Sequence, residues 1–170
     1  MTAPHDDTKL VEVLASRLAG NVVVVGVGNP LRGDDASGCL VAQALDGAPG
    51  VTVICAEEVP ESYLGPIKAA HPDVVVFVDA VDLAAAPGSA AILEMEELAS
   101  REASTHRAPL GLVAEFLRNE TGADIFLLAI QPAHLDFGDP VSPEVEESAG
   151  FMALLLRTLV KEAASCRPSR

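Results

Sequence analysis

Runs of apolar residues alternate along this chain with stretches in which apolar residues recur at helical spacing. Asn21–Val27, Val74–Val78 and Ile125–Ile130 are apolar at almost every position. Strands that are buried on both faces have this composition. Val51–Ala56, which follows a Pro-Gly turn, predicts another strand, and Ala90–Leu93 predicts a short strand that could pair at a sheet edge.

Helical spacing of apolar residues predicts helices around these strands, over Thr8–Leu18, Ser37–Leu45, Pro60–Ala70, Leu110–Gly122 and Pro143–Ala164. Ser142 is the expected N-cap of the last helix, and Pro143 suits its first position. Glu94–Arg107 is polar and irregular in pattern, so no element is predicted there. Because strands alternate with helices, we expect an α/β fold whose mainly parallel sheet is covered on both faces.

Composition indicates one globular domain. The 170 residues are 49% hydrophobic, which argues against disorder and allows a sizeable core. The chain has no internal repeat and no linker-like segment of low complexity. We therefore expect a single domain over residues 1–170, with an N-terminal helix within residues 1–20 and a frayed tail at residues 166–170.

Charge and targeting signals limit the cellular locations and the classes of partner that we expect. The net charge is −14 and Lys and Arg form no cluster, so nucleic acid and anionic membrane surfaces are poor partners. No apolar run approaches a membrane span, and the start MTAPHDDTKL lacks the apolar region of a secretory signal. Cys39, Cys55 and Cys166 form no CxxC pair; the first two are expected as small core residues. These features favour the cytoplasm.

The stretch Val22–Gly38, VVVVGVGNPLRGDDASG, is predicted as a strand, a glycine-rich loop and a helix start. Its glycines have the spacing of a phosphate-binding loop, but that motif continues with Lys and Ser or Thr, whereas Asp34 and Asp35 would repel a phosphate. Leu31 stands where the dinucleotide motif needs its third glycine. The two aspartates therefore favour a cation or a proton, unless one of them merely caps the following helix.

Asp79 is a second candidate, because it directly follows the apolar run VVVFV. The carboxyl ends of parallel strands lie at one edge of a sheet, where ligands bind, so Asp79 could meet Asp34 and Asp35 there. A charge after such a run needs a partner or a water-filled cleft. A solvated aspartate at a strand end is the alternative, and Asp82, in the following turn, is interpreted as structural.

His106 is the third candidate, in the segment STHRAP just before a predicted helix. The positive end of the helix dipole favours a neutral imidazole, the form that binds metals. Together with Asp35 and Asp79, it would form a set of two carboxylates and one imidazole that suits nickel, zinc or a similar ion. The sequence leaves open the alternative that His106 is an ordinary surface residue.

Other groups rank lower. His134 follows a strand end at the same sheet edge, and Glu57, Glu58 and Glu61 follow the second strand, where they line the same cleft or are simply solvated. No GxSxG elbow, HExxH helix or nucleophilic Ser or Cys arrangement stands out. Any bond cleavage would therefore use activated water rather than a covalent intermediate.

Four stretches, in this order, resemble the hydrogenase maturation endopeptidases: GVGNPLRGDDASG, VVVFVDAVD followed by AAAPG, STHRAPLGL, and DIFLLAIQP. The resemblance extends from Val22 to the last helix, and STHRAPL with IFLLAIQP is similar to the branch that processes group 3 and 4 type [NiFe] hydrogenases. It implies a three-layer αβα sandwich with a mainly parallel, twisted sheet of about five strands.

The resemblance also implies an activity: an aspartic-type endopeptidase that removes the C-terminal extension from the precursor of a [NiFe] hydrogenase large subunit. Nickel, supplied by that precursor, would be recognised by Asp35, Asp79 and His106, the positions that match the family's acid, strand-end aspartate and histidine. Asp35 and Asp79 would be the catalytic residues. Whether either is a general base or only a metal ligand stays open.

Two departures from the family pattern concern the loops. Ala36 follows the acid pair where many relatives have glycine, and Ala56–Pro60 replaces a glycine-rich turn that is expected to help form the substrate cleft. Partner specificity is therefore left open. Two other functions are considered: a non-enzymatic module that docks a nickel site, and a nucleotide-binding domain, which Asp34 and Asp35 disfavour.

Overall fold

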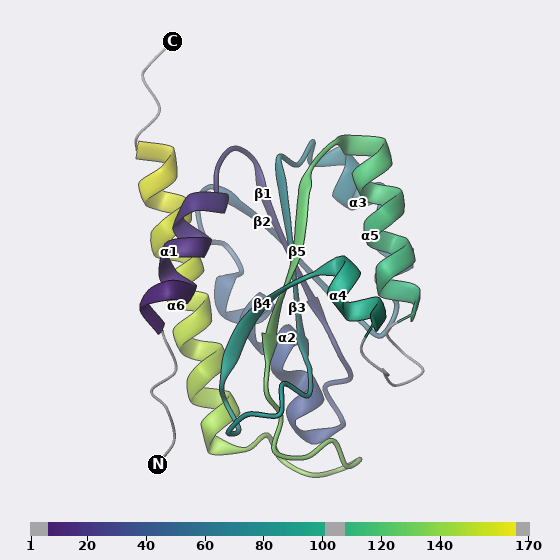
Figure 1. The fold of residues 1–170 in the computed structure, drawn as a ribbon, viewed down its shortest axis with the longest axis vertical. Helices are drawn as coiled ribbons and strands as arrows, with labels where there is room; N and C mark the ends of the chain where they lie inside the picture. The colour runs from purple at the N-terminus through teal and green to yellow at the C-terminus, as the bar shows by residue number, and fades with distance from the viewer. Residues whose placement is uncertain (1–6, 101–107, 166–170) are drawn as a thin grey trace.

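The computed structural model describes residues 7–100 and 108–165, which form one five-stranded sheet with helices on both faces (Figure 1). The strands are β1 (Val22–Val27), β2 (Val51–Glu57), β3 (Val74–Ala80), β4 (Ala90–Glu94) and β5 (Asp124–Ile130). Their order across the sheet is β2-β1-β3-β5-β4. Every pair is parallel except β4–β5. The expected α/β sandwich is confirmed, and Ala90–Leu93 lies in the antiparallel edge strand.

The helices are α1 (Asp7–Arg17), α2 (Ser37–Leu45), α3 (Leu64–Ala69), α4 (Met95–Ser100), α5 (Ala108–Thr121) and α6 (Pro143–Ser165), with 3₁₀ turns η1 (Gly33–Ala36) and η2 (Pro60–Tyr63). None of the helices in the described ranges combines the length and apolar character that crossing a bilayer requires. The predicted helix over Pro60–Ala70 is divided between η2 and α3.

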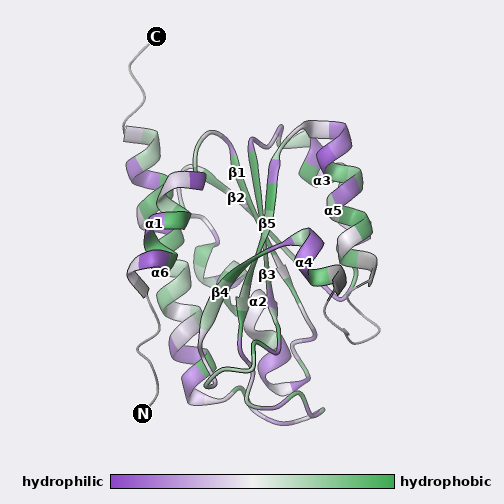
Figure 2. Cartoon of the chain, viewed as in Figure 1, coloured by the Kyte–Doolittle hydropathy of each residue, from purple (hydrophilic) through white to green (hydrophobic). Residues whose placement is uncertain are grey.

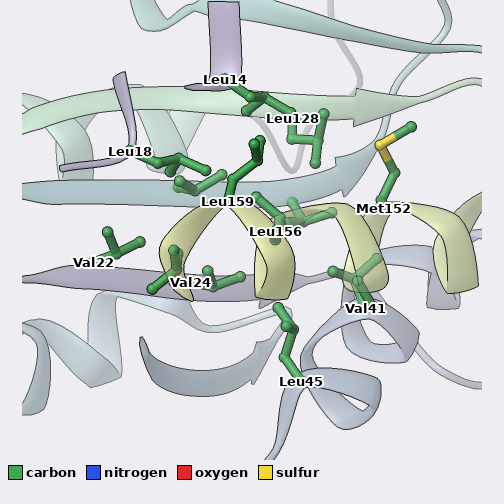
Figure 3. Packing of buried hydrophobic residues seen from close by; sticks show 14 of the residues in the cluster. Leu14, Leu18, Val22, Val24, Val41, Leu45, Leu128, Met152, Leu156 and Leu159 are labelled. Atoms are coloured by element: carbon green, nitrogen blue, oxygen red, sulfur yellow. The ribbon is translucent and has the colours of Figure 1, made fainter. Parts of the chain in front are cut away.

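Successive residues of the central strands enter two separate cores, because side chains alternate across a strand. Val22 and Val24 of β1 belong to the core under α1, α2 and α6, whereas Val23 and Val25 face the core under α3, α4 and α5. Figure 3 shows side chains from three helices meeting the sheet in the first core. Hydrophobic residues accordingly run through the central strands in Figure 2. This two-sided burial explains why these strands have no polar alternation.

Helix α4 lies where the sequence pattern predicts no element. Met95 and Leu98, one helical turn apart, are both buried on the sheet. The Glu97 carboxylate also accepts a hydrogen bond of 2.9 Å from the Glu94 N–H, as in a capping box. Six residues present too little periodicity to be recognised, so the prediction of an irregular Glu94–Ser100 is wrong; residues 101–107 lie outside the described ranges.

Glycine brings α2 against the carboxyl ends of β1 and β3. A Cβ atom on Gly38 would lie 2.1 Å from the Val78 carbonyl oxygen and 2.3 Å from that of Val27. No side chain fits there, so Gly38 allows the helix backbone to contact both strands directly. The turn η1, which immediately precedes α2, is thereby held at the ends of these two strands.

Candidate active site

A cavity of about 110 Å³ lies where β1 and β3 end. The chain leaves β1 for β2 on one side, while β3 and β5 lie on the other, so this is the switch point at which open α/β sheets bind ligands. The lining residues come from the ends of β1 and β3, from the segments that follow β1, β2 and β5, and from α5: Val27, Gly28, Arg32, Asp35, Glu58, Pro60, Asp79, Ala80, Leu110 and Leu135.

Asp35 reaches this cavity because the glycine-rich loop folds tightly against η1. Gly28 has φ +121°, and a Cβ atom there would lie 1.9 Å from the Asp35 carbonyl oxygen, so only glycine fits. The Asn29 N–H donates to Asp35 Oδ2 over 2.8 Å, and the Asp35 N–H donates to the Arg32 carbonyl over 3.0 Å. The backbone thus fixes both the turn and the carboxylate.

Asp79 enters the same cavity from β3, which continues for one residue beyond it. Strand alternation places its side chain on the sheet face that Val75 and Phe77 share with α3 and α5. Asp79 is only 7% exposed, and its Oδ1 accepts a 2.8 Å hydrogen bond from the Ala80 N–H. The structure therefore brings Asp35 and Asp79, far apart in sequence, to one small space.

His106 lies outside the described residues. In sequence it stands two positions before Ala108, where α5 begins, and Leu110 of that helix lines the cavity. Within the described residues, no group of three His, Cys, Asp or Glu side chains is arranged to hold a metal ion. Asp35 and Asp79 are thus the two predicted ligands that the structure places.

Asp34 has a different role from its neighbour. Its fully buried carboxylate accepts four hydrogen bonds, from the N–H groups of Ala133, His134 and Ser142 and from the Ser142 hydroxyl. Burial by itself raises the pKa of Asp34, but these hydrogen bonds outweigh it and hold the pKa below its ordinary value. Asp34 therefore fastens the loop between β5 and α6 to η1.

Arg32 and Glu58 also line the cavity. The Arg32 Nε–H donates to the Leu135 carbonyl over 3.3 Å, while its two terminal nitrogens have no hydrogen-bond or ion-pair partner in the described ranges. Glu58 Oε2 accepts from Asn29 Nδ2 over 3.0 Å. Sequence reasoning gave Arg32 no role; the signal was a cation directly beside the acid pair in LRGDD.

The lower-ranked candidates take other positions. His134 packs over Gly33, where a Cβ atom would lie 2.6 Å from His134 Nδ1, and that nitrogen is 3.8 Å from an Asp139 oxygen. Asp82 Oδ1 accepts from the Ala84 N–H over 2.9 Å, which agrees with a structural role in the turn. Glu57 is exposed and adopts φ +50°. None of these residues is among those that line the cavity.

The described cysteines are free thiols. Cys39 is buried, as expected for a core residue, and burial raises the pKa of its thiol. Cys55 is half-buried rather than fully enclosed.

The side chains that line the cavity offer carboxylates and a guanidinium, which together can bind a cation, accept a proton from water and stabilise a negatively charged oxygen.

Known proteins share this sequence and fold. The family model for hydrogenase maturation proteases of the HycI type matches residues 40–157. The hydrogenase 3 maturation protease of Escherichia coli K12 is 31% identical over 129 residues, which cover 74% of this chain and 82% of that protein.

Solved structures agree. The crystal structure of the [NiFe] hydrogenase maturation protease HycI from Thermococcus kodakarensis matches with a TM-score of 0.81 and 37% identity, over 88% of this chain and 99% of that one. The hydrogenase maturating endopeptidase HybD from E. coli matches with a TM-score of 0.66 and 25% identity, over 86% and 93% of the two chains. The protein therefore belongs to the hydrogenase maturation protease family and is an endopeptidase.

Proposed function

We propose that this endopeptidase acts in the cytoplasm and removes a C-terminal extension from the precursor of a [NiFe] hydrogenase large subunit after nickel has been inserted. The relatives support this substrate, since one is a [NiFe] hydrogenase maturation protease and another serves hydrogenase 3. The observation that carries the proposal is the position of Asp35 and Asp79 on the wall of one cavity at the switch point. Family membership does not favour a purely non-enzymatic docking module.

Nickel in this proposal is part of the substrate. Asp35, Asp79 and His106 would contact the nickel that the precursor carries, because carboxylate and imidazole groups together suit such an ion. A cavity of about 110 Å³ holds only a few water molecules. Any group bound in it must therefore lie close to both carboxylates, so that nickel contact would also position the peptide bond.

Hydrolysis then needs a base, a proton donor and stabilisation of the oxyanion. A carboxylate oxygen of Asp35 or Asp79 that is not bound to nickel accepts a proton from the attacking water and returns it to the leaving amine of the extension. Arg32 supplies a permanent positive charge, and its terminal nitrogens, which have no partner among the residues that the structure describes, suit the carbonyl oxygen as it becomes negative. No covalent enzyme intermediate is required.

Intact-mass spectrometry of the nickel-loaded precursor tests this function. We expect the native protein to shorten the precursor, and Asp35→Asn and Asp79→Asn to slow this reaction on the order of a hundredfold or more while retaining the fold. Asp82→Asn is the matched control, because Asp82 lies just after Asp79 and outside the cavity lining. Cleavage by Asp35→Asn at the native rate would refute its role, and an unchanged precursor mass with the native protein would refute the substrate.

A further inference from the structure

Three exposed apolar side chains gather beside the cavity. Leu31 is 61%, Leu135 36% and Phe137 74% exposed to solvent. Leu135 itself lines the cavity, and Leu31 adjoins Arg32, which also lines it. The Gly138 N–H donates to the Leu31 carbonyl over 2.9 Å, which places the chain around Phe137 beside Leu31. We call Leu31, Leu135 and Phe137 the apolar rim.

The two loops that carry the apolar rim are fastened to each other. Besides the bond to Leu31, the Asp34 N–H donates to the His134 carbonyl over 3.2 Å, and Arg32 Nε–H donates to the Leu135 carbonyl. The buried Asp34 carboxylate adds its four hydrogen bonds to the same loop. The rim is therefore a preformed surface, and binding to it would cost little ordering of the loops.

Isolated exposed apolar residues are ordinary, but a group of them beside a site marks an interaction surface. To reach Asp35 and Asp79, the peptide bond must enter this cavity, and the residues on either side of that bond extend over its edges. They must lie on the surface continuous with the cavity, and the apolar rim forms part of that surface through Leu135.

We propose that the apolar rim binds apolar side chains of the precursor next to the peptide bond that is cleaved. This inference rests on the proposed function and assigns Leu31 and Phe137 to substrate recognition. Asp136 and Asp139 flank Phe137 in the same loop, so an acidic segment of the precursor would be repelled. The favoured partner is therefore an extended, apolar, non-acidic segment of the polypeptide.

The test compares Leu31→Ser and Phe137→Ser with Leu154→Ser. Leu154, on α6, is 60% exposed, which matches the 61% exposure of Leu31, and it does not line the cavity. All three changes are made in the Asp79→Asn background, so that the nickel-loaded precursor stays intact while its dissociation constant is measured. We expect each rim change to raise that constant about tenfold and Leu154→Ser to leave it unchanged.

In the otherwise native protein, the same rim changes should slow cleavage at low precursor concentration, with recovery at high concentration. Rim variants that bind the precursor as tightly as the control would overturn the proposal. A rim change that converts a dimer of this chain to a monomer would assign the surface to self-association instead. Absence of cleavage by the native protein would contradict the proposed function alone, since the binding comparison does not depend on it.

Discussion

In the turn Gly33–Ala36, successive side chains of the 3₁₀ geometry are rotated by about 120°, so Asp34 and Asp35 leave the backbone in different directions. Asp35 faces the cavity, whereas Asp34 is enclosed by the loop before α6. The sequence indicates that this acid pair is chemically unusual. It does not distinguish the two, because the partners of Asp34 lie about a hundred residues further along the chain.

Arg32 provides a prediction at this scale. Arg32→Gln should reduce the cleavage rate at saturating precursor about a hundredfold, because one positively charged donor to the oxyanion is lost. Arg32→Lys should recover part of that rate, since it keeps the charge without the planar pair of donors.

Arg157→Gln is the control for this loss. Arg157 also donates to a backbone carbonyl, that of Ala44, but it lies outside the cavity lining. Steady-state kinetics of both variants separate the maximal rate from the half-saturating precursor concentration. If Arg32→Gln changed only the latter, Arg32 would bind the substrate rather than stabilise the oxyanion.

At the scale of elements, strong local patterns were the predictable part. The bounds of α2 agree with the predicted Ser37–Leu45, because one helix face is continuously apolar and glycine packs it on the strands. Helix α4 was missed because its six residues owe their conformation to burial of Met95 and Leu98 on the sheet. Ser142 was expected to cap α6, yet its hydroxyl donates to Asp34, a partner that only the tertiary fold supplies.

The hydrogen bonds of Asp34 connect η1 to the loop before α6, and their contribution to stability can be tested. The pKa of Asp34 is lowered in the folded protein, so its ionised form stabilises the fold at pH values above the ordinary aspartate pKa of about 3.9. That contribution is lost as the pH falls through the lowered value. Asp34→Asn should therefore reduce the free energy of unfolding at pH 7 by roughly 2–4 kcal/mol. Below about pH 4, the free energy of unfolding should fall less steeply with decreasing pH in this variant than in the native protein.

Urea denaturation across this pH range measures the effect of Asp34→Asn. Asp136→Asn, in the exposed part of the same loop, is the control and should change the free energy of unfolding by less than about 0.5 kcal/mol. Equal stability of the two variants at pH 7 would show that the Asp34 hydrogen bonds do not hold the loop.

For the whole molecule, parallel strand order is what allowed the site to be anticipated. β1 and β3 are parallel neighbours, so the residues that end them share an edge, and Asp35 and Asp79 could be placed together from sequence. The apolar rim could not, because Leu31 and Phe137 become neighbours only through the bond between the Leu31 carbonyl and the Gly138 N–H. The spacing of apolar residues along the chain does not indicate such a contact between two loops.

In the proposed mechanism, Asp35, Asp79 and His106, from distant parts of the chain, act together on one nickel-bearing precursor. The most direct test of this joint action is the intact mass of the precursor after incubation with the native protein or with His106→Gln. His71→Gln is the control, because His71 is also a histidine and is exposed. We predict one shortened product from the nickel-loaded precursor with the native and His71→Gln proteins, and no product with His106→Gln or from nickel-free precursor. Cleavage by His106→Gln at the native rate, or equal cleavage of nickel-free precursor, would contradict the account.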